Sequence, residues 1–165
     1  MATIHEFLRF FIDDNCLFHA LSRQIERLPS TGRNIKTCAR ELRRVITNWL
    51  AENLDKKVDD GGFGEPAKVS SFMTPDPATY LENMRQHGGG CCSWGDALCV
   101  RAAATVLKAR IIVFSTLGSQ PIVNEPFFFA VQNTRNASLL PELYLGHYAE
   151  QHYVSAVPLA ESLSR

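Results

Sequence analysis

The amino-acid sequence predicts a single α+β domain, in which helices come first and strands gather toward the C-terminal end. Apolar residues recur at helical spacing through the first half of the chain, and short runs rich in β-branched and aromatic residues follow in the last third. The chain has 165 residues and is 45% hydrophobic, which is enough for one domain with a proper core. We therefore expect one domain over residues 1–165, with a small, mostly antiparallel sheet flanked by helices.

The first predicted helix begins within the stretch IDDNCLFHALS and stops at Pro29, with Asp14 or Asn15 as its N-cap. Its apolar residues at helical spacing are Leu17, Phe18, Leu21, Ile25 and Leu28. A second, surface helix is expected over residues 35–50, because its apolar stripe leaves Arg40, Arg43 and Arg44 facing elsewhere, where we expect them to be solvated. Residues 56–71 are polar and glycine-rich and predict a long loop.

The second half of the chain is expected to supply two more helices and the strands. A short helix should start at Thr74-Pro75 and run through Met84, and residues 97–107 are apolar nearly all round, as in a buried helix. The segment between them, QHGGGCCS, is glycine-rich. Strands are predicted over residues 110–115, 127–131, 142–148 and 152–157.

Composition excludes several classes of partner and gives an expected location. Lysine plus arginine equal aspartate plus glutamate at 17 each, so no overall field attracts nucleic acid or a membrane surface, and we expect neither as a partner. We expect a monomer. The five cysteines are an odd number, and no charged leader followed by an apolar stretch opens the chain. These features favour an intracellular, reducing compartment.

Cys16 lies in the first turn of the first predicted helix, a position that suits a nucleophile. The positive end of the helix dipole and unpaired backbone N–H groups favour a thiolate there, and N–H groups of the turn over residues 13–16 are placed to donate to an oxyanion. Asn15 offers a further side-chain donor. The neighbouring carboxylates oppose ionisation, and the dipole is worth only about 0.3–1 kcal/mol, so a histidine from elsewhere is required. By position alone, packing is the commoner role for such a cysteine.

A histidine is available at the start of the last predicted strand, HYVSAV. Alternation puts His152 and Val154 on one face of that strand and Tyr153 and Ser155 on the other. A histidine at the start of a sheet strand is well held for use as a base. A second pair, His147-Tyr148, lies five positions earlier, and His147 is a competing candidate for the base; its simpler interpretation is a residue on the turn or loop before this strand.

Several motifs together resemble the ovarian tumour (OTU) family of cysteine proteases. DDNCLFHAL resembles the family's D-G-x-C-L-F-x-A motif, HYVSAV resembles H-Y-x-S-V, and the intervening WGDALCVRAAATVLKARIIVFS is similar to the family's W-G segment, Ala-rich helix and I-x-V-x-S strand. The resemblance covers residues 7–157 and implies a papain-like OTU fold. It also implies Cys16 as nucleophile, His152 as general base, and Asp13 as a residue that shapes the cysteine turn and its oxyanion hole. The oxyanion region comprises Asp13, Asp14, Asn15 and Cys16.

Two departures from the family pattern bear on catalysis. Asp14 replaces the usual glycine of the motif, which adds a side chain and a charge beside the nucleophile. Many members carry Asp or Asn two positions after the histidine to orient the imidazole, whereas this chain has Val154. Glu150 is the candidate residue for orienting the imidazole of His152, with Asp13 or a backbone carbonyl as alternatives.

Other features bear on the substrate cleft and on metals. Gly89, Gly90, Trp94 and Tyr153 are candidate residues of the cleft, since glycine exposes backbone for pairing with an extended peptide, although Trp94 and the glycines are equally explained by packing and flexibility. His87 with Cys91 and Cys92 lacks the spacing of a zinc site, so we expect no metal and no organic cofactor.

The resemblance implies a deubiquitinase, a thiol protease that hydrolyses isopeptide or peptide bonds after the C-terminal glycine of ubiquitin or a ubiquitin-like protein. Its partners would be ubiquitin or polyubiquitin chains. Two alternatives stay open: an OTU-like module that binds ubiquitin with weak or no catalysis, favoured by Val154 and Asp14, and a cysteine hydrolase that acts on another substrate.

Overall fold

The computed structural model describes residues 15–28, 38–58, 66–86, 94–127, 140–148 and 152–157. These ranges hold four α-helices, one 3-10 helix and six strands. The helices are α1 (Cys16–Arg27), α2 (Ala39–Glu52), α3 (Pro77–Arg85) and α4 (Ala97–Leu107), and the 3-10 helix is η2 (Val69–Phe72). The strands are β1 (Lys57–Val58), β2 (Ala67–Lys68), β3 (Arg110–Ser115), β4 (Ile122–Asn124), β5 (Glu142–Tyr148) and β6 (His152–Ser155).

Helix starts follow the local sequence. Asp76 and Asp96 are the N-caps of α3 and α4, and their carboxylates accept hydrogen bonds from the backbone N–H groups of Thr79 and Cys99, each at 2.9 Å. Pro77 occupies the first turn of α3, where its missing N–H costs nothing. Helix α1 differs, because its N-cap Asn15 makes no side-chain cap hydrogen bond.

Four strands form the main sheet, in the order β4-β3-β5-β6. β4 pairs with β3 and β6 pairs with β5 in antiparallel fashion, while the central pair of β3 and β5 is parallel. The expected small, mostly antiparallel sheet is therefore confirmed, with a parallel pair at its centre. In β6 the register places Tyr153 opposite His147 and His152 opposite Tyr148.

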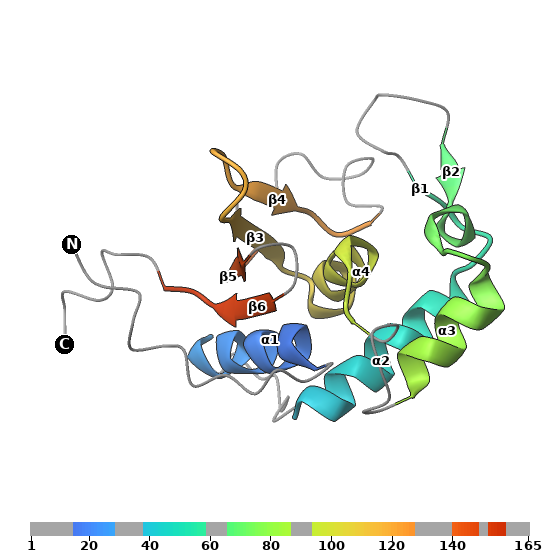
Figure 1. Ribbon diagram of the computed structural model, residues 1–165, viewed down its shortest axis with the longest axis horizontal. Helices are drawn as coiled ribbons and strands as arrows, with labels where there is room; N and C mark the ends of the chain where they lie inside the picture. Colours follow the sequence, from blue (N-terminus) through green and yellow to red (C-terminus); the bar gives the residue numbers. More distant parts are fainter. Residues whose placement is uncertain are drawn as a thin grey trace.

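The helices pack around this sheet in two groups. Helix α1 lies along β6 with the two elements running in the same direction, and α4 lies between the sheet and the pair α2 and α3 (Figure 1). The core follows this arrangement and joins the apolar faces of α1, α2 and α4 to β3 and β5. Within the described residues, no helix is both long and apolar enough to cross a membrane.

Three sequence-based expectations are corrected or remain outside the described residues. The predicted loop over residues 56–71 contains the ribbon β1-β2 and most of η2, and β4 was not foreseen. These elements are too short for hydrophobic periodicity to reveal them. Of the strand expected over residues 127–131, only Phe127 is described, and it lies in a turn.

Arg43 was expected on a solvated face, and that prediction was wrong. Its side chain is 1% exposed and lies in the core, beside the buried Thr47 of the same helix. The buried face of α2 is thus wider than its apolar stripe, because an arginine whose polar atoms are bonded can lie in the core. Arg44, in contrast, is exposed and pairs with Glu41.

Candidate active site

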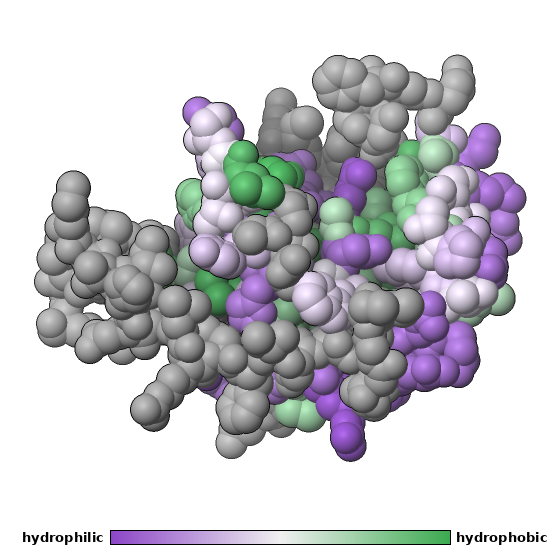
Figure 2. Space-filling view, viewed as in Figure 1, coloured by the Kyte–Doolittle hydropathy of each residue, from purple (hydrophilic) through white to green (hydrophobic). Residues whose placement is uncertain are grey.

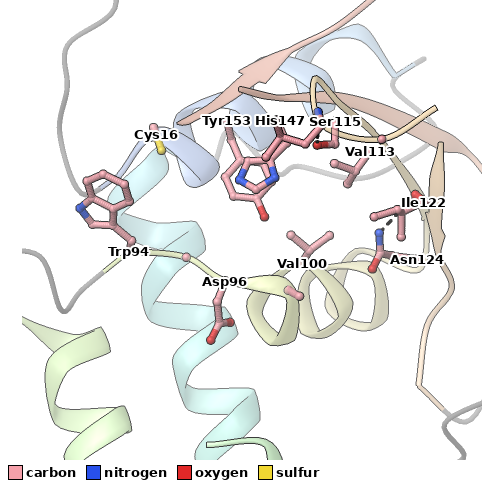
Figure 3. Close-up of a pocket in the computed structure, with 14 residues that line it drawn as sticks. Cys16, Trp94, Asp96, Val100, Val113, Ser115, Ile122, Asn124, His147 and Tyr153 are labelled. Carbon is pink, nitrogen blue, oxygen red and sulfur yellow. Dashed lines mark hydrogen bonds between the residues drawn. The ribbon is translucent and has the colours of Figure 1, made fainter. Parts of the chain in front are cut away.

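A cavity of about 460 Å³ opens between the start of α1, the start of α4 and the sheet. Cys16 lines it together with residues from three other parts of the chain (Figure 3). The lining comprises Cys16, Trp94, Gly95, Asp96, Ala97, Val100, Val113, Ser115, Leu117, Gly118, Ile122, Asn124, His147 and Tyr153. The cysteine is 8% exposed, and its sulfur is directed into the space between Trp94 and Tyr153.

Cys16 is the first residue of α1, as the sequence predicts, so the positive end of the helix lies at the cavity. Asn15 precedes it, and its Oδ1 accepts a hydrogen bond from Nε of Arg43 at 2.8 Å. The oxygen of this carboxamide is thus directed toward α2. The other two residues of the expected oxyanion region, Asp13 and Asp14, lie outside the described residues.

A buried glutamine joins the cysteine helix to the histidine strand. Gln24, 4% exposed, donates from Nε2 to Ser155 Oγ at 2.6 Å and to the carbonyl of Ala156 at 2.7 Å. Its Oε1 accepts from the N–H of Tyr144 at 2.9 Å. Cys16 lies eight residues before Gln24, about 12 Å along the helix, and His152 lies three residues before Ser155, about 10 Å along the strand. Because the two elements run the same way, Cys16 and His152 lie at the same end of the pair.

The two histidines occupy neighbouring strands and face different sides of the sheet. His147 lies in β5 rather than in a loop, lines the cavity, and stacks on Tyr153 with ring centroids 4.3 Å apart. Figure 3 shows these two rings together on the cavity wall. His152 is the first residue of β6, is half-buried, and is not among the residues that line the cavity. Strand alternation directs its side chain to the face opposite Tyr153.

Val154 lies on the same face as His152 and pairs with Gly146 of β5. A Cβ at Gly146 would come within 2.7 Å of Val154 Cγ2, so the glycine makes room for the branched side chain. Valine supplies no hydrogen-bonding group that orients an imidazole. The candidate for that role, Glu150, lies outside the described residues, as do Gly89 and Gly90 of the expected cleft.

Trp94 and Gly95 bring the start of α4 onto the cysteine helix. Trp94 is 36% exposed and lines the cavity opposite Tyr153. A Cβ at Gly95 would overlap Cδ2 of Leu17 and lie 3.1 Å from its Cβ, so only glycine permits this close approach. Leu17 is fully buried and directly follows Cys16. The packing of this loop therefore fixes the residue next to the cysteine.

Asp96 is a carboxylate at the cavity whose hydrogen bonds are directed to α3 and α4. Its Oδ1 accepts from the N–H of Cys99 at 2.9 Å and from the hydroxyl of Tyr80 at 3.0 Å, and Tyr80 also contacts Sγ of Cys99 at 3.3 Å. Burial, together with the Asp96 carboxylate, raises the pKa of the Cys99 thiol to about 12. Cys99 is therefore an inert core thiol.

The described residues show no group of three or more His, Cys, Asp or Glu side chains arranged to hold a metal ion. His87, Cys91 and Cys92 lie outside those residues. The cavity presents a thiol at a helix N-terminus and the imidazole of His147 on its sheet wall, and a second imidazole, that of His152, lies outside the lining at the start of the adjoining strand. A site of this kind defines the class of cysteine hydrolases, in which a thiolate attacks a carbonyl.

Comparison with known families agrees with this class. The model of the OTU family, described as OTU-like cysteine protease, matches residues 12–153. The chain belongs to the OTU family of cysteine proteases. The expected OTU fold, with Cys16 at a helix start and a histidine in the last strand, is thereby confirmed.

Individual relatives are more distant. The "Putative ubiquitin thioesterase L96" of Tipula iridescent virus is 26% identical over 153 residues, which cover 89% of this chain and 15% of that protein. The chain thus spans about a seventh of the length of this relative. Among solved structures, the OTU domain of OTUD1 superposes with a TM-score of 0.60 at 18% identity, covering 88% of this chain and 81% of that chain. The Hazara virus OTU bound to ubiquitin superposes with a TM-score of 0.54 at 14% identity, covering 90% and 77%.

Proposed function

We propose that this chain is a deubiquitinase that hydrolyses the isopeptide or peptide bond after the C-terminal glycine of ubiquitin or a ubiquitin-like protein. The observation that carries the proposal is the position of Cys16, which begins α1 and lines a cavity of about 460 Å³ beside Trp94 and Tyr153. Membership of the OTU family supplies the reaction class, and the name of the viral relative and the ubiquitin-bound neighbour supply the substrate.

The reaction proceeds through a thioester. The imidazole takes the proton of Cys16, and the thiolate attacks the carbonyl carbon of the terminal glycine. N–H groups at the start of α1 and in the preceding turn stabilise the oxyanion of the tetrahedral intermediate. The intermediate collapses as the C–N bond breaks, and the imidazolium gives its proton to the leaving amine. The same imidazole then deprotonates a water molecule that hydrolyses the thioester and releases the thiol.

His152 is the proposed base, because it starts the strand that runs beside the cysteine helix and matches the family's H-Y-x-S-V motif. His147 is a second candidate for this role, favoured by one specific observation: its ring lines the cavity that holds Cys16. Strand alternation puts His152 on the face opposite Tyr153, and His152 is not among the residues that line this cavity. Substituting each histidine therefore decides between them.

A protein substrate accords with the surface around the cavity. Leu117 and Ile122 belong to the β3–β4 hairpin, line the cavity, and are 71% and 58% exposed, and Val123 beside them is 44% exposed. Figure 2 shows apolar side chains gathered over this hairpin. Exposed apolar groups at the rim of a reactive cavity are typical of a protein-binding surface. An intracellular site of action, where ubiquitin and reduced thiols are both present, belongs to the same proposal.

The test is turnover of ubiquitin carrying a fluorogenic amide at its C-terminus. The parent should release the fluorophore, and Cys16→Ala should abolish the release, because no other group replaces the nucleophile. Turnover that survives Cys16→Ala would exclude this mechanism. Saturable binding of ubiquitin without turnover would favour the ubiquitin-binding module, and Cys16-dependent hydrolysis of small esters with ubiquitin untouched would favour a hydrolase with another substrate.

A further inference from the structure

Arg43 is a buried arginine directly behind the start of the cysteine helix. Its Nε donates to Oδ1 of Asn15 at 2.8 Å, and its Nη1 donates to the carbonyl of Met84 at 3.3 Å. The guanidinium carbon lies 4.7 Å from the centroid of the Phe18 ring. One side chain of α2 therefore connects the first turn of α1 to the last turn of α3.

The hydrogen bond to Asn15 changes what the N-cap of α1 does. An asparagine at this position usually accepts from N–H groups of the first turn, which have no partner within the helix. Asn15 makes no such cap hydrogen bond: its backbone, with φ −102° and ψ 7°, lies outside the extended region that a capping residue usually adopts, and its Oδ1 accepts from Arg43. The caps of α3 and α4, in contrast, use their side chains in the usual way. Helix α2 also lacks a side-chain cap hydrogen bond, but its N-cap is Cys38, so α1 is the described α-helix whose N-cap is an asparagine bonded elsewhere.

The second hydrogen bond of Arg43 holds its side chain in one position. Met84, whose carbonyl accepts from Arg43, lies in the last turn of α3. Carbonyl groups of a last turn receive no hydrogen bond from within their own helix. The planar guanidinium reaches both partners from one rigid group, which an ammonium cannot do. Asn15 is thus tied to α2 and α3 through a side chain that is 1% exposed.

We propose that Arg43 is a positioning residue for the thiol reaction. By holding Oδ1 of Asn15, it keeps this oxygen from the first-turn N–H groups of α1, so that those donors stabilise negative charge at Cys16 and on the oxyanion. When Arg43 is lost, Asn15 is released to adopt the extended backbone of a capping residue, and its oxygen then competes for the same donors. The proposal rests on the proposed function only in taking Cys16 as the nucleophile.

A double-mutant cycle separates this role from ordinary core packing. Arg43→Met keeps an apolar side chain in the core and removes both hydrogen bonds, and it is compared in the parent and in an Asn15→Ala background. Arg44→Met is the matched control, since Arg44 is the next residue of α2 and its side chain is 60% exposed. The readouts are kcat and KM on ubiquitin carrying a fluorogenic amide, with urea unfolding recorded for each variant.

The expected result is a kcat lowered on the order of 10- to 100-fold by Arg43→Met in the parent, with KM little changed. In the Asn15→Ala background the same change should lower kcat by no more than about threefold, because the competing oxygen is already gone. An equal loss in both backgrounds, or a kcat that matches the Arg44→Met control, would overturn the proposal. If Arg43→Met does not fold, Arg43→Leu carries the same comparison, because it also removes both hydrogen bonds.

A parent without activity on ubiquitin would contradict the proposed function and still leave Arg43 testable. The same cycle is then followed by the rate at which iodoacetamide alkylates Cys16, determined by peptide mass mapping. Arg43→Met should slow this alkylation in the parent and have little effect in the Asn15→Ala background, since first-turn donors also stabilise the thiolate. Alkylation rates that do not depend on Arg43, or that fall equally in both backgrounds, would overturn the proposal.

Discussion

Gln24 of α1 donates a 2.6 Å hydrogen bond to Ser155 of β6, and this contact sets the helix that begins with Cys16 beside the strand that begins with His152. The same carboxamide donates to the carbonyl of Ala156 and accepts from the N–H of Tyr144. A single buried side chain thus joins the helix that carries the proposed nucleophile to the strand that carries the proposed base.

Replacing Gln24 should lower both the free energy of unfolding and the rate of turnover. Gln24→Ala leaves the hydroxyl of Ser155 and two backbone groups without this partner, so we expect a loss of about 3 kcal/mol in the free energy of unfolding, measured with urea. The exposed Gln86 offers a matched control, and Gln86→Ala should stay within about 0.5 kcal/mol of the parent. Equal stability of the two variants would show that the Gln24 contacts do not hold α1 to the sheet.

Gly95 should tolerate no side chain, because a Cβ there overlaps Leu17 beside the cysteine. We expect Gly95→Ala to lower the free energy of unfolding by about 1–3 kcal/mol and to lower turnover by moving the start of α1. Gly118 is the stability control, since the nearest atom to a Cβ there is 3.7 Å away. If Gly95→Ala and Gly118→Ala unfold at the same urea concentration, the contact between Gly95 and Leu17 of α1 is not tight.

The buried thiol of Cys99 should make the protein less stable in alkali. Its pKa is raised to about 12 in the folded state, whereas an exposed thiol ionises near 9. Above pH 9 the unfolded chain releases this proton and the folded chain keeps it, so stability is complete below pH 9 and is lost as the pH rises toward 12. Between pH 8 and pH 10 this thiol should account for a loss of about 1.4 kcal/mol.

The measurement for Cys99 is urea unfolding at pH 8 and pH 10, in the parent and in Cys99→Ala. The decline between the two pH values should be smaller in the variant, whatever its stability at pH 8. An identical decline in both proteins would mean that burial in the folded state does not raise the pKa of the Cys99 thiol.

Substituting His152 and substituting His147 should affect different kinetic constants. If His152 is the base, His152→Ala should lower kcat about 100- to 10,000-fold, while His147→Ala should change mainly KM, because its ring lines the cavity. The measurement is steady-state hydrolysis of ubiquitin carrying a fluorogenic amide. A large fall in kcat with His147→Ala, and a small one with His152→Ala, would transfer the role of base to His147.

Much of the fold was predictable because its elements are long and periodic. The apolar spacing from Leu17 to Leu28 and the all-apolar helix over residues 97–107 both locate their helices to within a few residues. The strands at Arg110 and Glu142 were predictable from their β-branched and aromatic composition. Short elements such as β4, with three residues, lie below what such patterns reveal.

The site was less predictable, because its key contacts join residues far apart in the sequence. Nothing in the local sequence distinguishes the buried Arg43 from the exposed Arg44. Only the packing of the folded chain brings Asn15 and Met84 to Arg43. Gln24 likewise resembles a surface residue of an amphipathic helix until β6 packs against it. The predicted strand over residues 142–148 includes His147, but the pairing of His147 with Ser115 and Tyr153 depends on the register of three strands, which the sequence does not show.

The most direct test of the central claim is intact-mass analysis after mixing the chain with ubiquitin that carries a C-terminal electrophile. The parent should gain the mass of one ubiquitin, Cys16→Ala should gain none, and the adduct should map to Cys16. A folded parent that forms no adduct, or an adduct that persists in Cys16→Ala, would contradict the proposal that Cys16 attacks the C-terminus of ubiquitin.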